Sequence, residues 1–305
     1  MCKAAASATV IGIGWVLHDS VLLVPKYPVE DTKTEALKQV EQVGGPVPRA
    51  LSVISSLGFG TVIAAVVGDD ESGLACSKAL SGRGILTEEL QVVEGARTRR
   101  SHVWVSSENA SRTIAYSSDT LPHLHNLSSL MDAAEGAEIL HLDGRELQAA
   151  VPIAASMHDL GKTVVLDAGG WKPDVGYLLK HTDILVISSS TLKRLAGQDP
   201  LSEARRLRDE YSLRSVVVTV GSEGTWLVED VMPRHIPAPV VRAVDTNGAG
   251  DAFAGGLIYG LLNAWPVLES VRFGSGVAAL ACEHFGDFFP SVDDVIDVLK
   301  NGVLQ

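Results

Sequence analysis

The chain of 305 residues is long enough to bury a large core, and its net charge of −12 disfavours polyanionic partners. Since no run of Lys and Arg offsets this acidic balance, we expect neither nucleic acid nor an anionic membrane as a partner. Apolar residues make up 46% of the chain and aromatic residues only 5%, a balance typical of sheets covered by helices.

The three cysteines, Cys2, Cys76 and Cys282, stand far apart and form no pattern of metal ligands. They are interpreted as small, mostly buried thiols in a reducing compartment, which points to a cytoplasmic location. The apolar stretch near the N-terminus is short and interrupted, so we expect neither a signal peptide nor a membrane span there.

The first half of the chain alternates short apolar runs with stretches of helical period. Strands are expected at 9–13, 21–24 and 61–67, and helices at 47–57 and 72–80. Residues 98–116 alternate without helical period, which predicts a two-stranded hairpin with its turn near Glu108 and Asn109.

The second half repeats a strand followed by a helix. Strands are expected at 139–142, 163–167, 184–187 and 215–220, antiparallel extensions at 225–228 and about 237–241, and helices at 250–263, 267–282 and 292–299. This alternation predicts a mostly parallel sheet with helices on both faces. No internal repeat or linker divides the chain, so one α/β domain over residues 1–305 is expected.

Two strand-like segments, about 19–42 and 98–118, stand apart from this α/β body. We expect them to pair in a small sheet over the carboxyl ends of the parallel strands, where open α/β sheets bind ligands. Such a lid would exclude water from a group-transfer reaction. The alternative is that both segments are ordinary edge strands.

The most informative motif is the string Asp245-Thr246-Asn247-Gly248-Ala249-Gly250-Asp251, which precedes a buried helix. Gly248, Ala249 and Gly250 can present free backbone N–H groups at the helix N-terminus, a site that suits phosphate. Asp251 would repel a bound phosphate, but it is well placed to take a proton from an attacking hydroxyl. The alternative is an ordinary glycine-rich turn, and the complete string favours the functional interpretation.

Four blocks in this order make the chain resemble the ribokinase-like, or phosphofructokinase-B-type, carbohydrate kinases along nearly its whole length. The blocks are Gly44-Gly45 with the helix after it, VGDDESG at 67–73, TVGSEG at 219–224, and the string at 245–251. Nearer similarities are to ketohexokinases (residues 26–31, 112–114 and 142–145) and to sulfofructose kinases (residues 43–46, 118–122 and 269–273).

The resemblance implies a ribokinase-like fold and an ATP-dependent kinase that phosphorylates a sugar hydroxyl with Mg²⁺ under a β-lid. The resemblance further implies a homodimer, because the lid of these kinases often mediates dimerisation. It also implies that Asp251 is the catalytic base, that residues 248–250 form the anion hole, and that Asp19, Gly44 and Gly45 adjoin the sugar. Asp143 and Arg145 follow a strand and are further substrate candidates. The residues expected to border the nucleotide are Thr219, Gly221, Ser222, Gly224 and Asn247.

Arg49 departs from the family pattern, because most members have there an Asn that bonds the sugar. A guanidinium only donates hydrogen bonds, and its fork suits a carboxylate, phosphate or sulfonate. We therefore hypothesise an anionic substrate held by Arg49, with further arginines as helpers. The alternative is that Arg49 points to solvent or packs on the lid. The helper candidates are Arg97, Arg99, Arg100 and Arg112.

The second departure concerns a family motif, Asn-x-x-Glu, that orders the water shell of Mg²⁺. Ser188 and Thr191 stand at the matching positions, so we expect at most an indirect role for them at the metal. A monovalent cation such as K⁺ near Asp245 is left open. Two other activities also stay open, a nucleoside kinase of the same superfamily and an idle sensor of sugar or nucleotide.

Overall fold

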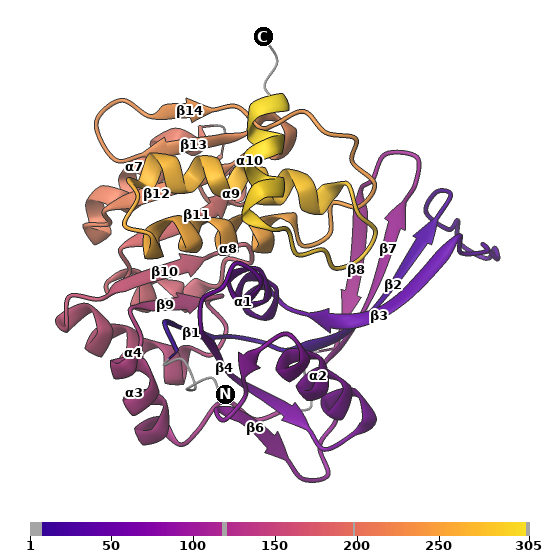
Figure 1. The fold of residues 1–305 in the computed structure, drawn as a ribbon, viewed down its shortest axis with the longest axis horizontal. Coiled ribbons are helices and arrows are strands. Elements are labelled where there is room, and N and C mark those ends of the chain that lie inside the picture. Colours follow the sequence, from indigo (N-terminus) through magenta and orange to yellow (C-terminus); the bar gives the residue numbers. More distant parts are fainter. Residues whose placement is uncertain (1–7, 118–120, 198, 303–305) are drawn as a thin grey trace.

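The computed structural model describes residues 8–117, 121–197 and 199–302, and a ten-stranded sheet runs through its centre (Figure 1). The strand order is β14-β13-β12-β11-β10-β9-β1-β4-β5, with β6 also paired to β4. All neighbouring strands from β12 to β5 and β6 are parallel, whereas β13 pairs antiparallel with β12, and β14 pairs antiparallel with β13. The strands are β1 (Val10–Ile13), β4 (Thr61–Gly68), β5 (Ile85–Leu86), β6 (Leu90–Val93), β9 (Ile139–Leu142), β10 (Thr163–Asp167), β11 (Ile184–Ser188), β12 (Ser215–Thr219), β13 (Thr225–Val228) and β14 (Arg234–Ile236).

Helices cover both faces of this sheet, and each face has its own apolar core. One core joins the sheet to α1 (Pro46–Ser56), α2 (Glu71–Gly82), α8 (Ala249–Leu262) and α9 (Val267–Cys282), with α10 (Val292–Asn301) packed outside α9. The other core joins the sheet to α3 (Leu127–Gly136), α4 (Leu147–Asp159), α5 (Gly176–Leu179), α6 (Ser189–Ala196) and α7 (Pro200–Tyr211). Because both faces are covered, these central strands are buried along their whole length and consist mostly of apolar residues.

Side chains at the helix starts explain where several helices begin. Asp70 accepts a hydrogen bond from the Gly73 amide at the start of α2, and Asp199 caps α7 in the same way. Ser291 and Asp294 form a reciprocal capping box at α10. These local signals fix helix boundaries, whereas the two apolar cores fix the faces that the helices bury.

A second, four-stranded sheet projects from the body at the right of Figure 1. It consists of β2 (Leu17–Val24), β3 (Lys38–Gly44), β7 (Arg100–Ser106) and β8 (Arg112–Tyr116), in the order β3-β2-β7-β8. The β2–β7 pair is parallel and the two outer pairs are antiparallel. The two strand-like segments that stood apart in the sequence therefore pair with each other, although Ser118 at the end of one lies outside the described residues.

The sequence-based boundaries were wrong in a few places. The strand expected at 237–241 is instead β14 at Arg234–Ile236, because Pro237 and Pro239 lack the N–H that a ladder needs. β2 begins at Leu17 rather than at 21. The short strands β5 and β6 were not predicted, and β3 (Lys38–Gly44) was expected only as part of the strand-like segment 19–42. In the described part of the chain, no helix combines the length and the apolar character that a bilayer span requires.

Candidate active site

The parallel strands place a row of polar residues along one edge of the central sheet. β1, β9, β10, β11 and β12 all end at this edge, since they run in one direction. Gly14, Asp143, Asp167, Ser188 and Thr219 lie at or just after these strand ends. Among them, Asp143 and Asp167 are buried. This is the edge at which open α/β sheets bind ligands.

The turn before α8 is held in place by Asp245. Its Oδ1 accepts a hydrogen bond from the Asn247 amide (2.8 Å) and its Oδ2 accepts one from the Gly286 amide (3.2 Å). Gly248 then adopts a left-handed conformation (φ 77°) as the N-cap, and α8 begins at Ala249. Asp245 therefore ties the turn to the loop after α9, which leaves the first N–H groups of α8 without partners inside the helix.

Asp251 lies in the first turn of α8 and is half-buried. Burial raises the pKa of Asp251 above its usual value, while Arg49 and Arg112 act against the shift. Burial also raises the pKa of Asp167 well above the usual range, and the charge of Asp251 adds to that shift. The two carboxylates are thus electrostatic neighbours, and Asp251 lies in the first turn of α8.

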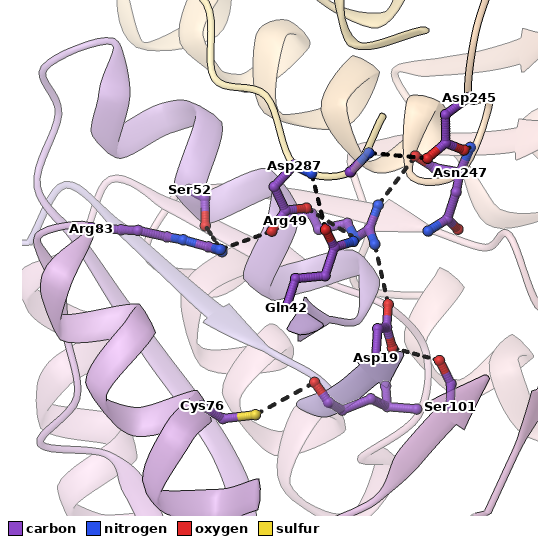
Figure 2. A network of polar contacts seen from close by, with 12 residues as sticks. Asp19, Gln42, Arg49, Ser52, Cys76, Arg83, Ser101, Asp245, Asn247 and Asp287 are labelled. Atoms are coloured by element: carbon purple, nitrogen blue, oxygen red, sulfur yellow. Dashed lines mark hydrogen bonds and ion pairs between the residues drawn. The ribbon is translucent and has the colours of Figure 1, made fainter. Parts of the chain in front are cut away.

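Arg49 is the centre of a buried polar network that joins α1 to three other parts of the chain (Figure 2). From α1, its Nη2 contacts Asp19 Oδ2 on β2 at 3.1 Å, and its Nη1 donates to the Asn247 carbonyl at 3.1 Å. Its Nε lies 3.8 Å from Asp287 Oδ1 in the loop after α9. Asp287 is also paired with Arg83 at 2.8 Å, and Ser101 donates to Asp19 at 2.6 Å.

The positive charge of Arg49 is therefore neutralised within the protein. Burial acts to lower the pKa of Arg49, but four surrounding carboxylates outweigh it and raise that pKa. The cavity beside the guanidinium measures about 20 Å³, which is room for about one water. Arg49 is only 6% exposed, so the alternative that it points to solvent is wrong, whereas its contact with Asp19 on β2 fits the alternative that it packs on the second sheet. The four carboxylates belong to Asp287, Asp19, Asp251 and Asp245.

The glycine pair before α1 is needed by the chain itself. A Cβ on Gly44 would lie 2.0 Å from Asp19 Oδ1, and Gly45 has φ 109° with its Cβ position 2.2 Å from the Trp15 carbonyl. Neither position accepts a side chain without movement of the backbone. The glycine pair thus leaves room for the Asp19 carboxylate beside Arg49. The expected contact of Gly44 and Gly45 with a sugar stays a prediction.

The second sheet contacts the turn before α8 directly. The Ala110 carbonyl, between β7 and β8, accepts hydrogen bonds from the Thr246 amide (3.2 Å) and hydroxyl (2.8 Å). Arg112 Nη1 lies 3.5 Å from the same hydroxyl. The tip of the β7–β8 hairpin therefore lies on the string that the sequence singled out.

A second polar group, which we call the tryptophan cluster, comprises Trp15, Arg99, Tyr116, Arg145 and Glu146. The guanidinium carbons of Arg99 and Arg145 each lie 4.3 Å from the centroid of the Trp15 ring, and Tyr116 meets that ring edge to face. Trp15 Nε1 donates to Glu146 Oε1 at 2.9 Å. Trp15 therefore belongs to the same edge of the sheet, immediately after Gly14.

The residues expected at the nucleotide lie on the neighbouring part of this edge. Thr219 ends β12 in register with Ser188, and Gly221 and Ser222 follow as exposed residues of a short 3₁₀ turn (Gly221–Glu223). Gly224 is buried, and a Cβ there would lie 2.1 Å from the Ile236 carbonyl. The expected nucleotide contacts stay predictions, because the structure explains Gly224 by packing alone.

Ser188 and Thr191 do not fit a direct magnesium site. The Ser188 hydroxyl caps α6 and shares a hydrogen bond with the Thr191 hydroxyl (2.9 Å), to which Arg194 also donates (3.1 Å). A guanidinium at this distance disfavours a divalent cation. Across residues 8–117, 121–197 and 199–302, no group of three His, Cys, Asp or Glu side chains is arranged to hold a metal. Of the cysteines, Cys76 is buried, Cys282 is partly buried and Cys2 lies outside the described residues.

Several residues of the site carried no signal in the sequence. Asp287, Ser101 and Gln42 lie outside every motif, yet Asp287 pairs with two arginines and Gln42 Oε1 accepts from the Asp287 amide at 3.0 Å. The only indirect sign is the aromatic stretch His284–Pro290 around Asp287, which is unusual in a chain poor in aromatics.

Comparisons with known proteins agree with this geometry. The model of the pfkB family carbohydrate kinases matches residues 10–294. The chain is 25% identical to an ATP-dependent ribose-1-phosphate kinase of Halopiger xanaduensis (91% of this chain, 93% of that protein) and 24% identical to the ketohexokinase of Mus musculus (90% and 95%). The structure of Arabidopsis thaliana ribokinase complexed with ribose and ATP superposes with a TM-score of 0.82 at 22% identity, over 97% of this chain and 99% of that one.

The fold is accordingly ribokinase-like, with a mostly parallel sheet between helices and a separate small sheet. The chain belongs to the pfkB family of carbohydrate kinases. It is therefore a phosphotransferase with an alcohol group as acceptor, as the sequence predicted.

Proposed function

We propose that the protein transfers the γ-phosphate of ATP to a hydroxyl of a sugar, and that Asp251 is the base. The observation that carries this proposal is the position of Asp251 in the first turn of α8, next to amides that have no partner inside the helix. Because burial raises its pKa, this carboxylate is a stronger base than an exposed aspartate.

The other residues of the site supply orientation and charge. Asp19, fixed by Ser101 and Arg49, would accept hydrogen bonds from sugar hydroxyls at the base of the second sheet. The amides of 248–250 would stabilise the charge on the transferred group. Arg112, on β8, would add a positive charge there, since it acts electrostatically on Asp251 and touches Thr246. The second sheet would exclude water as a lid.

ATP would lie along the adjoining edge, between Asn247 and the turn after β12. Magnesium, which the resemblance implies, would be bound mainly by the ATP phosphates and water. Ser188 and Thr191 would touch at most that water shell. We also propose a cytoplasmic enzyme that forms a homodimer through the second sheet. The half-exposed Ile114 and Tyr116 on β8 and the exposed Leu37 before β3 support such an interface.

The proposal is tested by Asp251→Asn. This variant should bind ATP as the wild type does by calorimetry, because the amide keeps the shape of the side chain. Its ATP-dependent turnover of sugars should fall about 10²–10⁴-fold, since no general base remains. The matched control is Asp297→Asn, at an exposed position on α10.

The assay uses a panel of ketoses, aldoses, their phosphates, and nucleosides. Turnover by Asp251→Asn close to that of the wild type would refute the assignment of the base. Turnover of nucleosides alone would identify a nucleoside kinase, and ATP binding without turnover of any acceptor would favour a sensor.

A further inference from the structure

Arg145 is an arginine of this site that makes no contact with an acidic side chain among the described residues. Its guanidinium carbon lies 4.3 Å from the centroid of the Trp15 ring and 5.6 Å from that of Tyr116. Its side chain makes no hydrogen bond or ion pair with any described residue, and its Nη1 is buried and unpartnered. A buried donor without an acceptor is costly, so this position is suited to an acceptor that the protein does not itself provide.

The two nearest carboxylates are already engaged elsewhere. Glu146 Oε1 accepts from the Trp15 indole (2.9 Å) and Oε2 from the Leu124 amide (3.1 Å). Asp143 Oδ2 accepts from the Trp15 amide (2.9 Å), and its Oδ1 from the Arg145 backbone amide (3.1 Å). Burial raises the pKa of Asp143 to about 6, which weakens it further as a countercharge. The charge of the Arg145 side chain is therefore uncompensated by contact.

Arg145 follows β9, whose neighbour β10 ends at Asp167, so Arg145, Asp143 and Asp167 belong to the same edge of the sheet. Asp167 interacts electrostatically with both Asp251 and Asp143, and Asp143 with Arg145. Arg145 Nη2 also reaches the loop after β10, at 3.5 Å from the Cβ position of Gly170. A sugar whose accepting hydroxyl meets Asp251 would thus extend toward Arg145.

We propose that Arg145, stacked on Trp15, binds an acidic group of the acceptor sugar, which makes the acceptor a sugar phosphate, sulfonate or carboxylate. This inference rests on the proposed kinase function. A guanidinium binds such oxyanions through two parallel hydrogen bonds, and stacking on an indole fixes its plane. Tyr116, on β8 of the second sheet, lies near the same guanidinium, with 5.6 Å between the guanidinium carbon and the ring centroid, so this sheet adjoins the proposed binding position. The selectivity hypothesised for Arg49 therefore belongs to Arg145.

The experiment compares matched pairs of neutral and acidic acceptors in the intact protein. The pairs are ribose with ribose 1-phosphate, and fructose with fructose 1-phosphate, fructose 6-phosphate and 6-deoxy-6-sulfofructose. We expect at least one acidic sugar to have a higher kcat/KM than its neutral parent. Arg145→Gln should lower kcat/KM for that sugar by about 10- to 100-fold, mostly through KM, and leave the neutral parent within about threefold.

Two further variants control for a merely structural role. Arg145→Lys keeps the charge without the fork and should recover part of the preference. Arg214→Gln, at an exposed arginine before β12, should change neither member of a pair. The inference would be overturned if kcat/KM for each neutral sugar equalled that for its acidic partners, or if Arg145→Gln lowered kcat/KM equally for both. Either result would leave the proposed kinase function intact.

Absence of turnover with every sugar would instead refute the proposed function. Calorimetric titration with the same sugars, without ATP, still tests the inference in that case. Binding of an acidic sugar that Arg145→Gln weakens about tenfold or more would support it. Equal binding of acidic and neutral sugars would contradict it.

Discussion

Arg49 and Arg145 border the same candidate site, and both are packed against other side chains of the chain. Arg49 touches Asp19 and Asp287 and interacts electrostatically with two further carboxylates, whereas the Arg145 side chain stacks on aromatic rings and touches no carboxylate of the described residues. Both guanidinium groups would suit an anion, but only that of Arg145 makes no contact with a carboxylate of the described residues. The comparison teaches that the countercharge around an arginine, rather than its position near a motif, indicates whether it is available to a ligand.

The largest expected effect separates the two arginines by stability. Arg49→Gln leaves Asp19 buried without its cation, so the free energy of unfolding should fall by about 3–5 kcal/mol. Arg145→Gln removes no ion pair and should cost less than about 1 kcal/mol. Urea unfolding at pH 7 measures both variants.

The double variant Arg49→Gln with Asp19→Asn sharpens this result. Because the second change removes the stranded charge, the combined loss should be smaller than the sum of the single losses. Additive losses, or equal costs for the two arginine variants, would contradict the contrast between them.

A smaller effect is expected at Gly248, the N-cap of α8, and at Gly250, in the first turn of that helix. Gly248→Ala places a Cβ 1.9 Å from Arg49 Nη1 on a backbone with φ 77°, so it should cost about 1–3 kcal/mol. Gly250→Ala meets nothing within 4 Å and lies inside α8, so stability should stay constant or rise by up to about 1 kcal/mol. Thermal unfolding measures the stability of the two variants. An equal loss of stability in both would contradict the close contact between Arg49 and Gly248.

The smallest expected effect is a shift of the pH profile. Asp251 acts as a base only when deprotonated, and Arg112 lowers its pKa against the effect of burial. Removal of that charge in Arg112→Gln raises the pKa of Asp251, so activity is lost at a higher pH as the solution is acidified. The acid limb of kcat/KM against pH measures this shift.

Arg100→Gln is the matched control for the pH profile, because Arg100 is exposed on β7 and acts on Asp70 instead. Its acid limb should coincide with that of the wild type. An acid limb that stays in place in Arg112→Gln, or moves to lower pH, would show that Arg112 does not act on the base.

The parallel core was predictable from the sequence because its strands are buried on both faces and therefore appear as short, mostly apolar runs. The runs at 139–142 and 163–167 match β9 and β10 in full. β5 has only two residues and β3 is mostly polar, so neither offers such a run. The prolines at 237 and 239 should have excluded a strand there, and the apolar residues around them misled the prediction.

By itself, the sequence determined that a glycine turn with Asp251 opens a buried helix, because the residues of this motif are contiguous and act through local backbone geometry. Only the tertiary structure decided which arginine is neutralised. The partners of Arg49 lie 30 and 198 residues away at Asp19 and Asn247, and no local pattern records them. Ionic partnership depends on distance in space, so the difference between Arg49 and Arg145 emerges only when the chain is folded.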